Sequence, residues 1–381
     1  MRSGWIKLDF EKCIKKVPNT YKVPKKEFLA EGDFPIISQE DSFINGYWND
    51  QSAVFRVEKP IVLFGDHTKI IKLIDFDFVK GADGTKVFLP IDSLNSKFFA
   101  YQLQSIKLKD LGYARHYRLL KEKQLLIPPL EEQQQIVAIL DDAFAAIEQA
   151  QANIEKNIDN AKELFQSKLN EIFSQKGEDW TEKTLDEIAI DFGRGKSKHR
   201  PRNDKKLFGG KYPFVQTGDI RNTSKILKNY SQTYNEIGLA QSKLWPKGTI
   251  CITIAANIAE SAILDFESCF PDSIIGLVVD KGKATNDYTY YALQFLKSQL
   301  KDLGKGSAQD NINLGTFQKQ YFPFPNIEKQ REIANVLEDI EKIGIKLEHK
   351  YQQKLTNLED LKKSLLEQAF AGKLTDKDMP A

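Results

Sequence analysis

The sequence is poor in the features that mark secreted, metal-bound and membrane-spanning proteins. Its 381 residues include three cysteines, Cys13, Cys251 and Cys269, and no CxxC pair, which argues against a disulfide framework and a zinc site. No window approaches 18 consecutive apolar residues, so we expect no membrane-spanning helix. The opening MRSGWIKLDF lacks the apolar core of a signal peptide. We therefore expect a protein of the reducing cytoplasm.

Motifs for nucleotide, cofactor or metal chemistry are also missing. GRGKS (193–197) invites comparison with a phosphate-binding loop, but the position that needs the first glycine holds Ile190. We find no Asn-Pro-Pro-aromatic methyltransferase motif, no glycine-rich cofactor loop and no carboxylate cluster for metal-dependent cleavage. The sequence therefore predicts a non-catalytic chain without a metal site or cofactor of its own.

Charge is nearly balanced but unevenly spread along the chain. With 55 basic and 53 acidic residues the formal net charge is +2. Residues 1–127 and 177–324 are mildly basic, 128–176 is acidic and 325–381 is nearly neutral. Mild basicity of two separate segments permits nucleic-acid binding without requiring it.

The chain contains a long internal repeat. PPLEEQQQIVAIL (128–140) matches PNIEKQREIANVL (325–337), and the offset of 197 continues without a gap to Phe173 and Phe370. Upstream, KFFAYQLQSIKLKDLG (97–112) matches TYYALQFLKSQLKDLG (289–304). Because repeats fix architecture, we predict two copies of one unit, each a globular block followed by one long helix.

The predicted long helices have the pattern of a coiled coil. Ile136, Leu140, Ala143, Ile147 and further apolar residues are spaced by alternating steps of four and three, with one stutter, and the second copy repeats this pattern. About 43 residues make a helix roughly 65 Å long. Neither helix can bury its apolar stripe alone, so we predict that the two pair antiparallel. The alternative is a pair of long core helices inside one domain.

The globular blocks are predicted to mix helices and strands. The fold class is thus α+β: two mixed α/β domains separated by an antiparallel two-helix coiled coil, related by a pseudo-two-fold repeat. The predicted boundaries are 1–127, 128–176, 177–324, 325–373 and a tail at 374–381. Predicted strands cover 53–57, 60–64, 69–74, 248–254 and 273–279, and an amphipathic aromatic helix near the end of each block covers 95–110 and 286–302.

A basic loop is the most prominent candidate binding segment. FGRGKSKHRPRNDKK (192–206) holds Arg194, Lys196, Lys198, His199, Arg200 and Arg202. Such a loop can contact DNA phosphates or base edges. The alternative, a solvated surface loop, is equally compatible with the composition.

Three further segments carry candidate contacts. FGDHTK (64–69) reads as a polar turn between strands whose His67, Thr68 and Lys69 could reach a base edge. YARHYR (113–118) and GSAQDNIN (306–313) occupy corresponding places before the two long helices. Arginine pairs with guanine, and asparagine or glutamine with adenine, although such residues also cap turns. The candidates there are Arg115, His116, Arg118, Gln309, Asn311 and Asn313.

Over essentially its whole length the sequence resembles the specificity subunit of type I restriction-modification systems. The resemblance rests on the two helix-start motifs, the duplicated layout, GSAQDNIN, and FGDHT followed by IDFDFVKGADG (74–84). It implies that each block is a target-recognition domain for one half of a two-part site in double-stranded DNA. It also implies that the paired helices set the spacer and dock two methyltransferase subunits.

The resemblance places the chemistry in partner subunits. Those partners would bring S-adenosylmethionine for adenine methylation, and motor and nuclease subunits that can join would bring ATP and Mg²⁺. Base contacts cannot be carried over, because recognition domains vary greatly within such a family. Two other hypotheses stay open: a structural coiled-coil adaptor that does not read DNA, and a stand-alone nucleotide hydrolase or nuclease.

Overall fold

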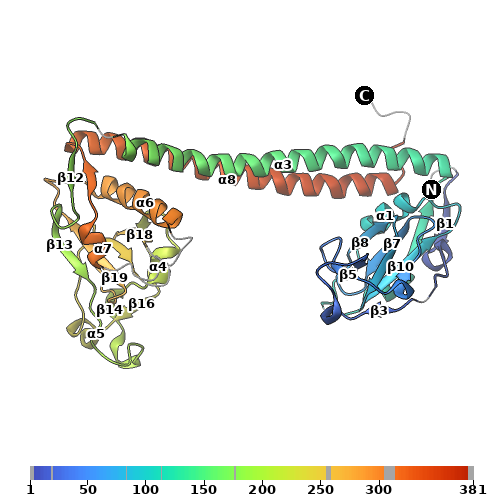
Figure 1. Cartoon of the computed structure of the whole chain (residues 1–381), viewed down its shortest axis with the longest axis horizontal. Helices are drawn as coiled ribbons and strands as arrows, with labels where there is room; N and C mark the ends of the chain where they lie inside the picture. Colours follow the sequence, from blue (N-terminus) through green and yellow to red (C-terminus); the bar gives the residue numbers. More distant parts are fainter. Residues whose placement is uncertain are drawn as a thin grey trace. The chain divides into compact units, whose positions relative to one another are not determined.

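The computed structural model describes residues 4–18, 20–82, 84–112, 114–175, 177–254, 259–303 and 314–375. The chain forms two compact units. Unit 1 comprises Met1–Glu155 and Tyr351–Ala381, and unit 2 comprises Lys156–Lys350. Each unit therefore contains one globular block, the beginning of one long helix and the end of the other. The long helices are α3 (Leu130–Ser174) and α8 (Ile327–Phe370), which confirms the predicted α+β fold class with two long helices (Figure 1).

In its described residues the block of unit 1 contains three small sheets, two short α-helices and several 3-10 turns. Its sheets have the strand orders β2-β10-β7-β8, β3-β9-β4-β5 with β6 on β9, and β1-β11. The strands are β1 (Ile6–Asp9), β2 (Ile14–Lys15), β3 (Lys22–Val23), β4 (Phe34–Ile37), β5 (Gly46–Trp48), β6 (Val54–Phe55), β7 (Ile61–Gly65), β8 (Ile71–Ile74), β9 (Phe78–Gly81), β10 (Thr85–Pro90) and β11 (Gln124–Ile127); the helices are α1 (Ser96–Ser105) and α2 (Tyr117–Lys121).

The block of unit 2 is built around a five-stranded sheet of order β13-β19-β17-β18-β15, with the pairs β14-β16 and β12-β20 beside it. The strands are β12 (Thr181–Lys183), β13 (Ala189–Arg194), β14 (Phe208–Phe214), β15 (Ile226–Leu227), β16 (Gln232–Tyr234), β17 (Ile250–Thr253), β18 (Ser261–Leu264), β19 (Ile274–Val279) and β20 (Phe322–Phe324); the helices are α4 (Thr217–Arg221), α5 (Glu236–Ala240), α6 (Asn286–Leu303) and α7 (Leu314–Lys319).

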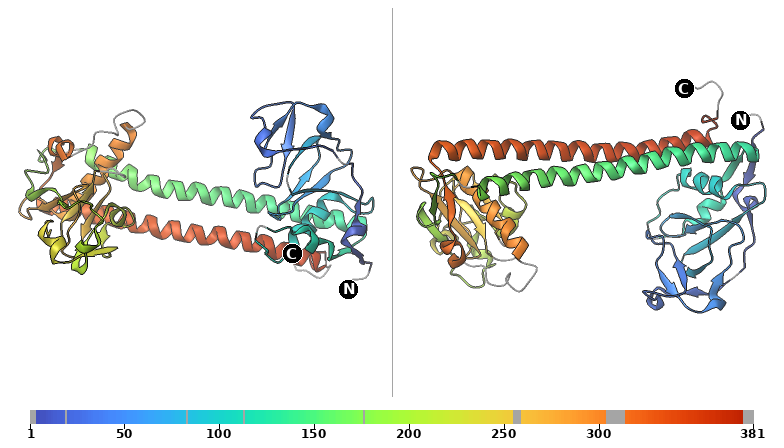
Figure 2. Two further views of the ribbon diagram at one scale, coloured as in Figure 1. Left: turned by 90° about the horizontal axis from the view of Figure 1, so that it is seen from below. Right: turned by 45° about the horizontal axis from the view of Figure 1, so that its top comes forward.

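Each core combines the start of one long helix with the end of the other. In unit 1, Ile136 and Leu140 of α3 share a cluster with Leu366 and Ala369 of α8. In unit 2, Leu337 of α8 shares a cluster with Leu169 and Phe173 of α3. Each long helix therefore buries part of its apolar stripe in the core of unit 1 and another part in the core of unit 2. Figure 2 shows the antiparallel run of the two helices.

The helix starts are fixed by two equivalent buried glutamines. Gln133 accepts a hydrogen bond from the Asn95 amide at 2.8 Å and donates to the Ser93 and Pro128 carbonyls. Gln330 accepts from the Thr285 amide at 2.9 Å and donates to the Lys283 and Pro325 carbonyls. Both side chains are fully buried. Gln133 therefore ties α3 to the segment before α1, and Gln330 ties α8 to the segment before α6.

The first segment of unit 1, before β1, and its last segment, after α8, both contact the carboxylate of Glu132. The Glu132 side chain accepts a hydrogen bond from the indole of Trp5 at 3.1 Å and from the Thr375 hydroxyl at 2.8 Å. Just before Thr375, α8 stops at a left-handed Gly372, with φ +74°. The amide of Gly372 donates to Ala369 and the amide of Lys373 to Gln368, the pattern of a Schellman cap.

Two sequence predictions differ from the structure. The strand predicted at 53–57 is reduced to β6, Val54–Phe55, because a 3-10 turn occupies Gln51–Ala53. The helix predicted at 95–110 ends at Ser105, although the identical LKDLG continues helix α6 in unit 2 to Leu303. Tertiary contacts explain the second difference: Asp110 pairs with Lys69, and the Leu111 amide donates to His116.

Candidate nucleic-acid interface

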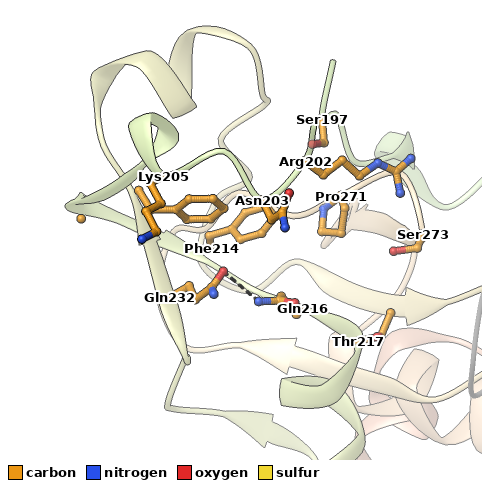
Figure 3. Close-up of a pocket in the computed structure, with 12 residues that line it drawn as sticks. Ser197, Arg202, Asn203, Lys205, Phe214, Gln216, Thr217, Gln232, Pro271 and Ser273 are labelled. Carbon is orange, nitrogen blue, oxygen red and sulfur yellow. Dashed lines mark hydrogen bonds between the residues drawn. The ribbon is translucent and has the colours of Figure 1, made fainter. Parts of the chain in front are cut away.

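The basic loop of unit 2 borders a surface hollow of about 640 Å³. The loop leaves β13 at Arg194 and ends in a 3-10 turn at Lys205–Leu207. The hollow is lined by Arg202, Asn203 and Lys205 of the loop and by Gln216 and Gln232, with Phe208, Phe214 and Pro271 among the apolar lining residues (Figure 3). The loop therefore faces a cavity whose lining carries cations and amides, the groups that contact phosphates and base edges.

Internal contacts hold the middle of this loop in shape. The His199 ring lies 2.9 Å from the Asp204 carboxylate, and the His199 amide donates to Gln241. The Lys206 amide and the His199 ring, in that order, hold the pKa of Asp204 below its ordinary value. Because His199 is half-buried and bonded within the loop, it orders the loop in this conformation.

The loop cations fall into two groups. Arg200 donates to the carbonyls of Ser197 and His199, and Arg202 donates to Asp272 at 2.8 Å. Arg194, Lys196 and Lys198 are exposed, and within the described parts of the chain their side chains have no hydrogen-bond or ion-pair partner. These three side chains can therefore contact phosphates without breaking a hydrogen bond or ion pair within the protein.

Two glutamines at the hollow were not predicted from the sequence. Gln216 starts α4, where its amide donates to Asp219, and its side chain donates to Gln232 of β16 at 2.9 Å (Figure 3). A glutamine amide can bond adenine bidentately. No local signal marks these residues, because Gln216 and Gln232 come together only through the pairing of β14 with β16.

In unit 1 the structure forms a lysine-lined groove of about 450 Å³. Its cationic side chains come from four strands or their ends: Lys15, Lys16, Lys22, Lys80 and Lys86. The one carboxylate among its described lining residues, Glu11, is paired with Lys121 at 2.7 Å. The sequence shows no basic cluster here, since these lysines are spread over seventy residues.

The FGDHT segment forms the expected turn between β7 and β8 and has an additional structural role. Asp66 is 2% exposed, its carboxylate accepts from the Tyr117 amide at 2.7 Å, and its carbonyl accepts from His116. Thr68 donates to the Gln39 carbonyl. The acidic residue beside His67 therefore anchors α2 and is not available for acid-base chemistry in this conformation.

The candidate residues at 67–69 and 115–118 differ in exposure and in their partners within the protein. His116 is fully buried, with one ring nitrogen 3.1 Å from the Asp66 carbonyl and the other accepting from Leu111. This corrects the expectation that His116 reaches a base, because both ring nitrogens are used inside the protein. Arg115 and Arg118 are exposed. Lys69 pairs with Asp110 at 3.4 Å, and the His67 amide donates to Gln39.

The corresponding loop of unit 2 lies outside the described residues, and with it Gln309, Asn311 and Asn313. Among the described residues, no group of three or more His, Cys, Asp or Glu side chains could hold a metal ion. Within the same ranges, no helix has the length and hydropathy needed to cross a membrane. The three cysteines are free and buried.

Comparison with known proteins assigns the duplicated architecture to a family. The profile described as type I restriction modification DNA specificity domain matches residues 13–158 and 177–357, one match per copy of the repeat. The chain therefore belongs to the family of type I restriction-modification DNA specificity domains. The two matched segments are its two target-recognition domains with their adjoining helices.

Individual relatives agree with this assignment. The chain is 24% identical over 345 residues to the EcoR124I/EcoR124II specificity subunit of Escherichia coli, covering 84% of this chain and 82% of that protein. It is 27% identical over 273 residues to a putative MjaX specificity subunit of Methanocaldococcus jannaschii, covering 67% and 60%.

Two solved structures share the fold. One, from work on complex assembly and conformational transition of the type I restriction-modification system, has a TM-score of 0.73 at 17% identity, covering 98% of this chain and 99% of that one. The HsdS subunit of Thermoanaerobacter tengcongensis has a TM-score of 0.62 at 19% identity, covering 98% of each chain.

Proposed function

We propose that this chain reads a two-part DNA sequence and holds the methyltransferase subunits that modify it. The main support for this proposal is the duplicated unit, in which the equivalent buried glutamines Gln133 and Gln330 each attach a block to a long helix. Two similar but non-identical blocks suit two different half-sites, and the length of the paired helices sets the gap between them. The same logic ties half-site spacing to protein geometry in dimeric DNA-binding proteins.

Within each block, the proposed contact surface is the one lined by cations and amides. In unit 2 it is the hollow, with Gln216 and Gln232 as base-reading candidates, together with the exposed cations Arg194, Lys196 and Lys198 of the same loop. In unit 1 it is the lysine-lined groove, with the exposed Arg115 and Arg118 as further phosphate contacts. Phosphate contacts position such a protein and base contacts specify the sequence.

The chemistry is proposed to lie in partner subunits. Two methyltransferase subunits docked on the long helices would supply S-adenosylmethionine-dependent methylation, and motor and nuclease subunits would add the ATP- and Mg²⁺-dependent steps. On this proposal the chain contributes sequence recognition and assembly. His67, Thr68, Lys69 and His199 serve mainly the turns that carry neighbouring contacts.

The test is spacing dependence. The chain is co-purified with the methyltransferase subunits of its own system, and the methylated positions are mapped by single-molecule sequencing to give both half-sites and their gap. Duplexes are then made with the gap changed by one base pair in each direction. We expect methylation and tight binding to be lost in both. Unchanged binding and methylation would contradict spacer recognition, and salt-insensitive or absent duplex binding would favour a structural adaptor instead.

A further inference from the structure

Lys80 stands apart from the other buried lysines of the described chain. Three lysines are buried there: Lys72, Lys80 and Lys225. The Lys72 ammonium donates to three backbone carbonyls, at 3.0, 2.6 and 3.4 Å. Lys225 pairs with two carboxylates, at 2.7 and 2.9 Å. Lys80 is only 4% exposed, yet within the described residues its ammonium has no hydrogen-bond or ion-pair partner, and the Phe55 ring centroid lies 5.7 Å away.

The strand pairing places a second lysine against Lys80. Lys22 of β3 is the register partner of Lys80 of β9 in a parallel pair. The Lys22 ammonium donates to the Thr85 carbonyl at 3.4 Å, which leaves its charge uncompensated. Like charges directly opposite one another destabilise a sheet, and a charge on a largely buried side chain costs further free energy when it has no partner. Burial and the charge of Lys22, in that order, lower the pKa of Lys80.

Both lysines line the unit 1 groove together with two more whose charges are also uncompensated. Lys16 is exposed and has no side-chain partner within the described residues. The Lys86 ammonium lies 5.3 Å from the centroid of the Tyr117 ring, a contact that leaves its positive charge in place. The groove thus gathers cations around the ammonium of a largely buried lysine side chain and lacks an available carboxylate among its described lining residues.

We propose that this groove is an anion site in which Lys80, supported by Lys22, holds one backbone phosphate of the DNA bound by unit 1. The inference rests on the proposed DNA-reading function and adds the residue and ligand group that anchor the first recognition domain. A phosphodiester supplies the negative charge and acceptor oxygens that two facing ammonium groups need. Its arrival replaces repulsion between Lys22 and Lys80 with two attractive contacts.

The experiment measures duplex binding and thermal stability of the full chain with its methyltransferase subunits. Lys80→Met removes the charge and keeps an unbranched side chain, and Lys7→Met, on exposed β1 outside the groove, is the matched control. We expect Lys80→Met to weaken binding roughly 10-fold or more and to reduce the slope of log affinity against log salt by about 1. Its melting temperature without DNA should be equal or higher, since an unpaired buried charge is removed.

The outcomes separate this inference from the proposed function. Unchanged affinity and salt slope in Lys80→Met, or loss of the folded state, would overturn the phosphate site, because Lys80 would then be surface or structural. Stabilisation by millimolar inorganic phosphate that depends on Lys80 but is not displaced by duplex would also overturn it, in favour of a free anion. If the unsubstituted complex binds no duplex at any salt concentration, the proposed function itself fails.

Discussion

Gln133 and Gln330 make the same three kinds of hydrogen bond at the starts of the two long helices. Each accepts from one backbone amide, Asn95 before α1 or Thr285 before α6, and donates to two carbonyls. Both residues come from the matched motifs EEQQQI and EKQREI. The repeat in sequence is therefore also a repeat in buried polar contacts, which identifies the join between block and helix as the shared element of the two copies.

We predict that each glutamine stabilises its own unit. Gln133→Met leaves one buried amide and two carbonyls without partners and should destabilise unit 1 by about 2–4 kcal/mol. Hydrogen exchange should accelerate at the Asn95 amide and stay unchanged at Thr285; Gln330→Met should do the reverse. Gln135→Met, at an exposed position of α3, is the control. Equal protection at both amides in all variants would contradict this role.

The two groups of loop cations should differ in their effect on DNA binding. Replacing the unpartnered Arg194, Lys196 and Lys198 by alanine should lower the salt slope of duplex binding by up to about one unit for each lost phosphate contact. Replacing Arg200 and Arg202, which are bonded to the protein, should change it less. Titration of duplex at several salt concentrations measures both, and identical slopes for the two variants would show that the distinction has no bearing on binding.

Gln216 and Gln232 should influence which sequence is bound. The double replacement by leucine should relax discrimination at one base pair by roughly 10-fold while leaving the salt slope unchanged, because no charge is removed. Competition between duplexes that differ at single positions of the mapped half-site gives the answer. Gln318→Leu, on α7 and outside the hollow, should have no effect; a loss of affinity for all sequences alike would contradict base reading.

Matched shortening of the long helices should shorten the recognised gap. In unit 1, Gln151 bonds Glu359 at 2.6 Å, and in unit 2, Lys162 pairs with Glu348 at 3.2 Å, in the same antiparallel register. Deleting 155–161 and 349–355 removes one heptad from each helix, about 10 Å of length. Genome methylation mapping should then report the same half-sites with a gap shorter by about three base pairs. Deleting one segment alone should disturb assembly, and an unaltered gap after the double deletion would argue against the helices as spacer.

Glu338 should make the stability of unit 2 acid-sensitive. Its carboxylate bonds Lys342 and Lys225, which lower its pKa to about 2. Because the folded-state pKa lies below the unfolded value near 4.5, the stabilisation is present above pH 4.5 and is lost as the pH falls towards 2. With partial exposure, we expect about 1 kcal/mol at pH 7. Urea unfolding of Glu338→Gln should converge with that of the unsubstituted protein near pH 2.

The predictable parts of this fold are those with local periodicity. The heptad pattern predicted both long helices, and the strands at Ile61–Gly65 and Ile274–Val279 follow from short apolar runs. LKDLG shows the limit: residues 108–111 are irregular and the same four residue types at 300–303 are helical, because contacts of Asp110 with Lys69 and of Leu111 with His116 outweigh local preference.

The proposed contact surfaces were predictable only where their residues are adjacent in sequence. The basic loop is one continuous segment and could be found. The lysine groove depends on β3 lying beside β9, a parallel pairing between residues nearly sixty positions apart, and no sequence pattern shows which strands pair. His116 was misassigned for a related reason: its ring is buried against Asp66, fifty residues earlier.

The carboxylate of Glu132, shared by Trp5 and Thr375, brings the segment before β1 and the segment after α8 to the same side chain within unit 1. Each core already includes the last turns of the long helix that belongs to the other repeat. A short linker from Thr375 to Trp5, with the chain start moved to the join after α3, would leave the same side chains in each core. The order of the two recognition domains in the polypeptide would then change, while both proposed contact surfaces would keep the same residues.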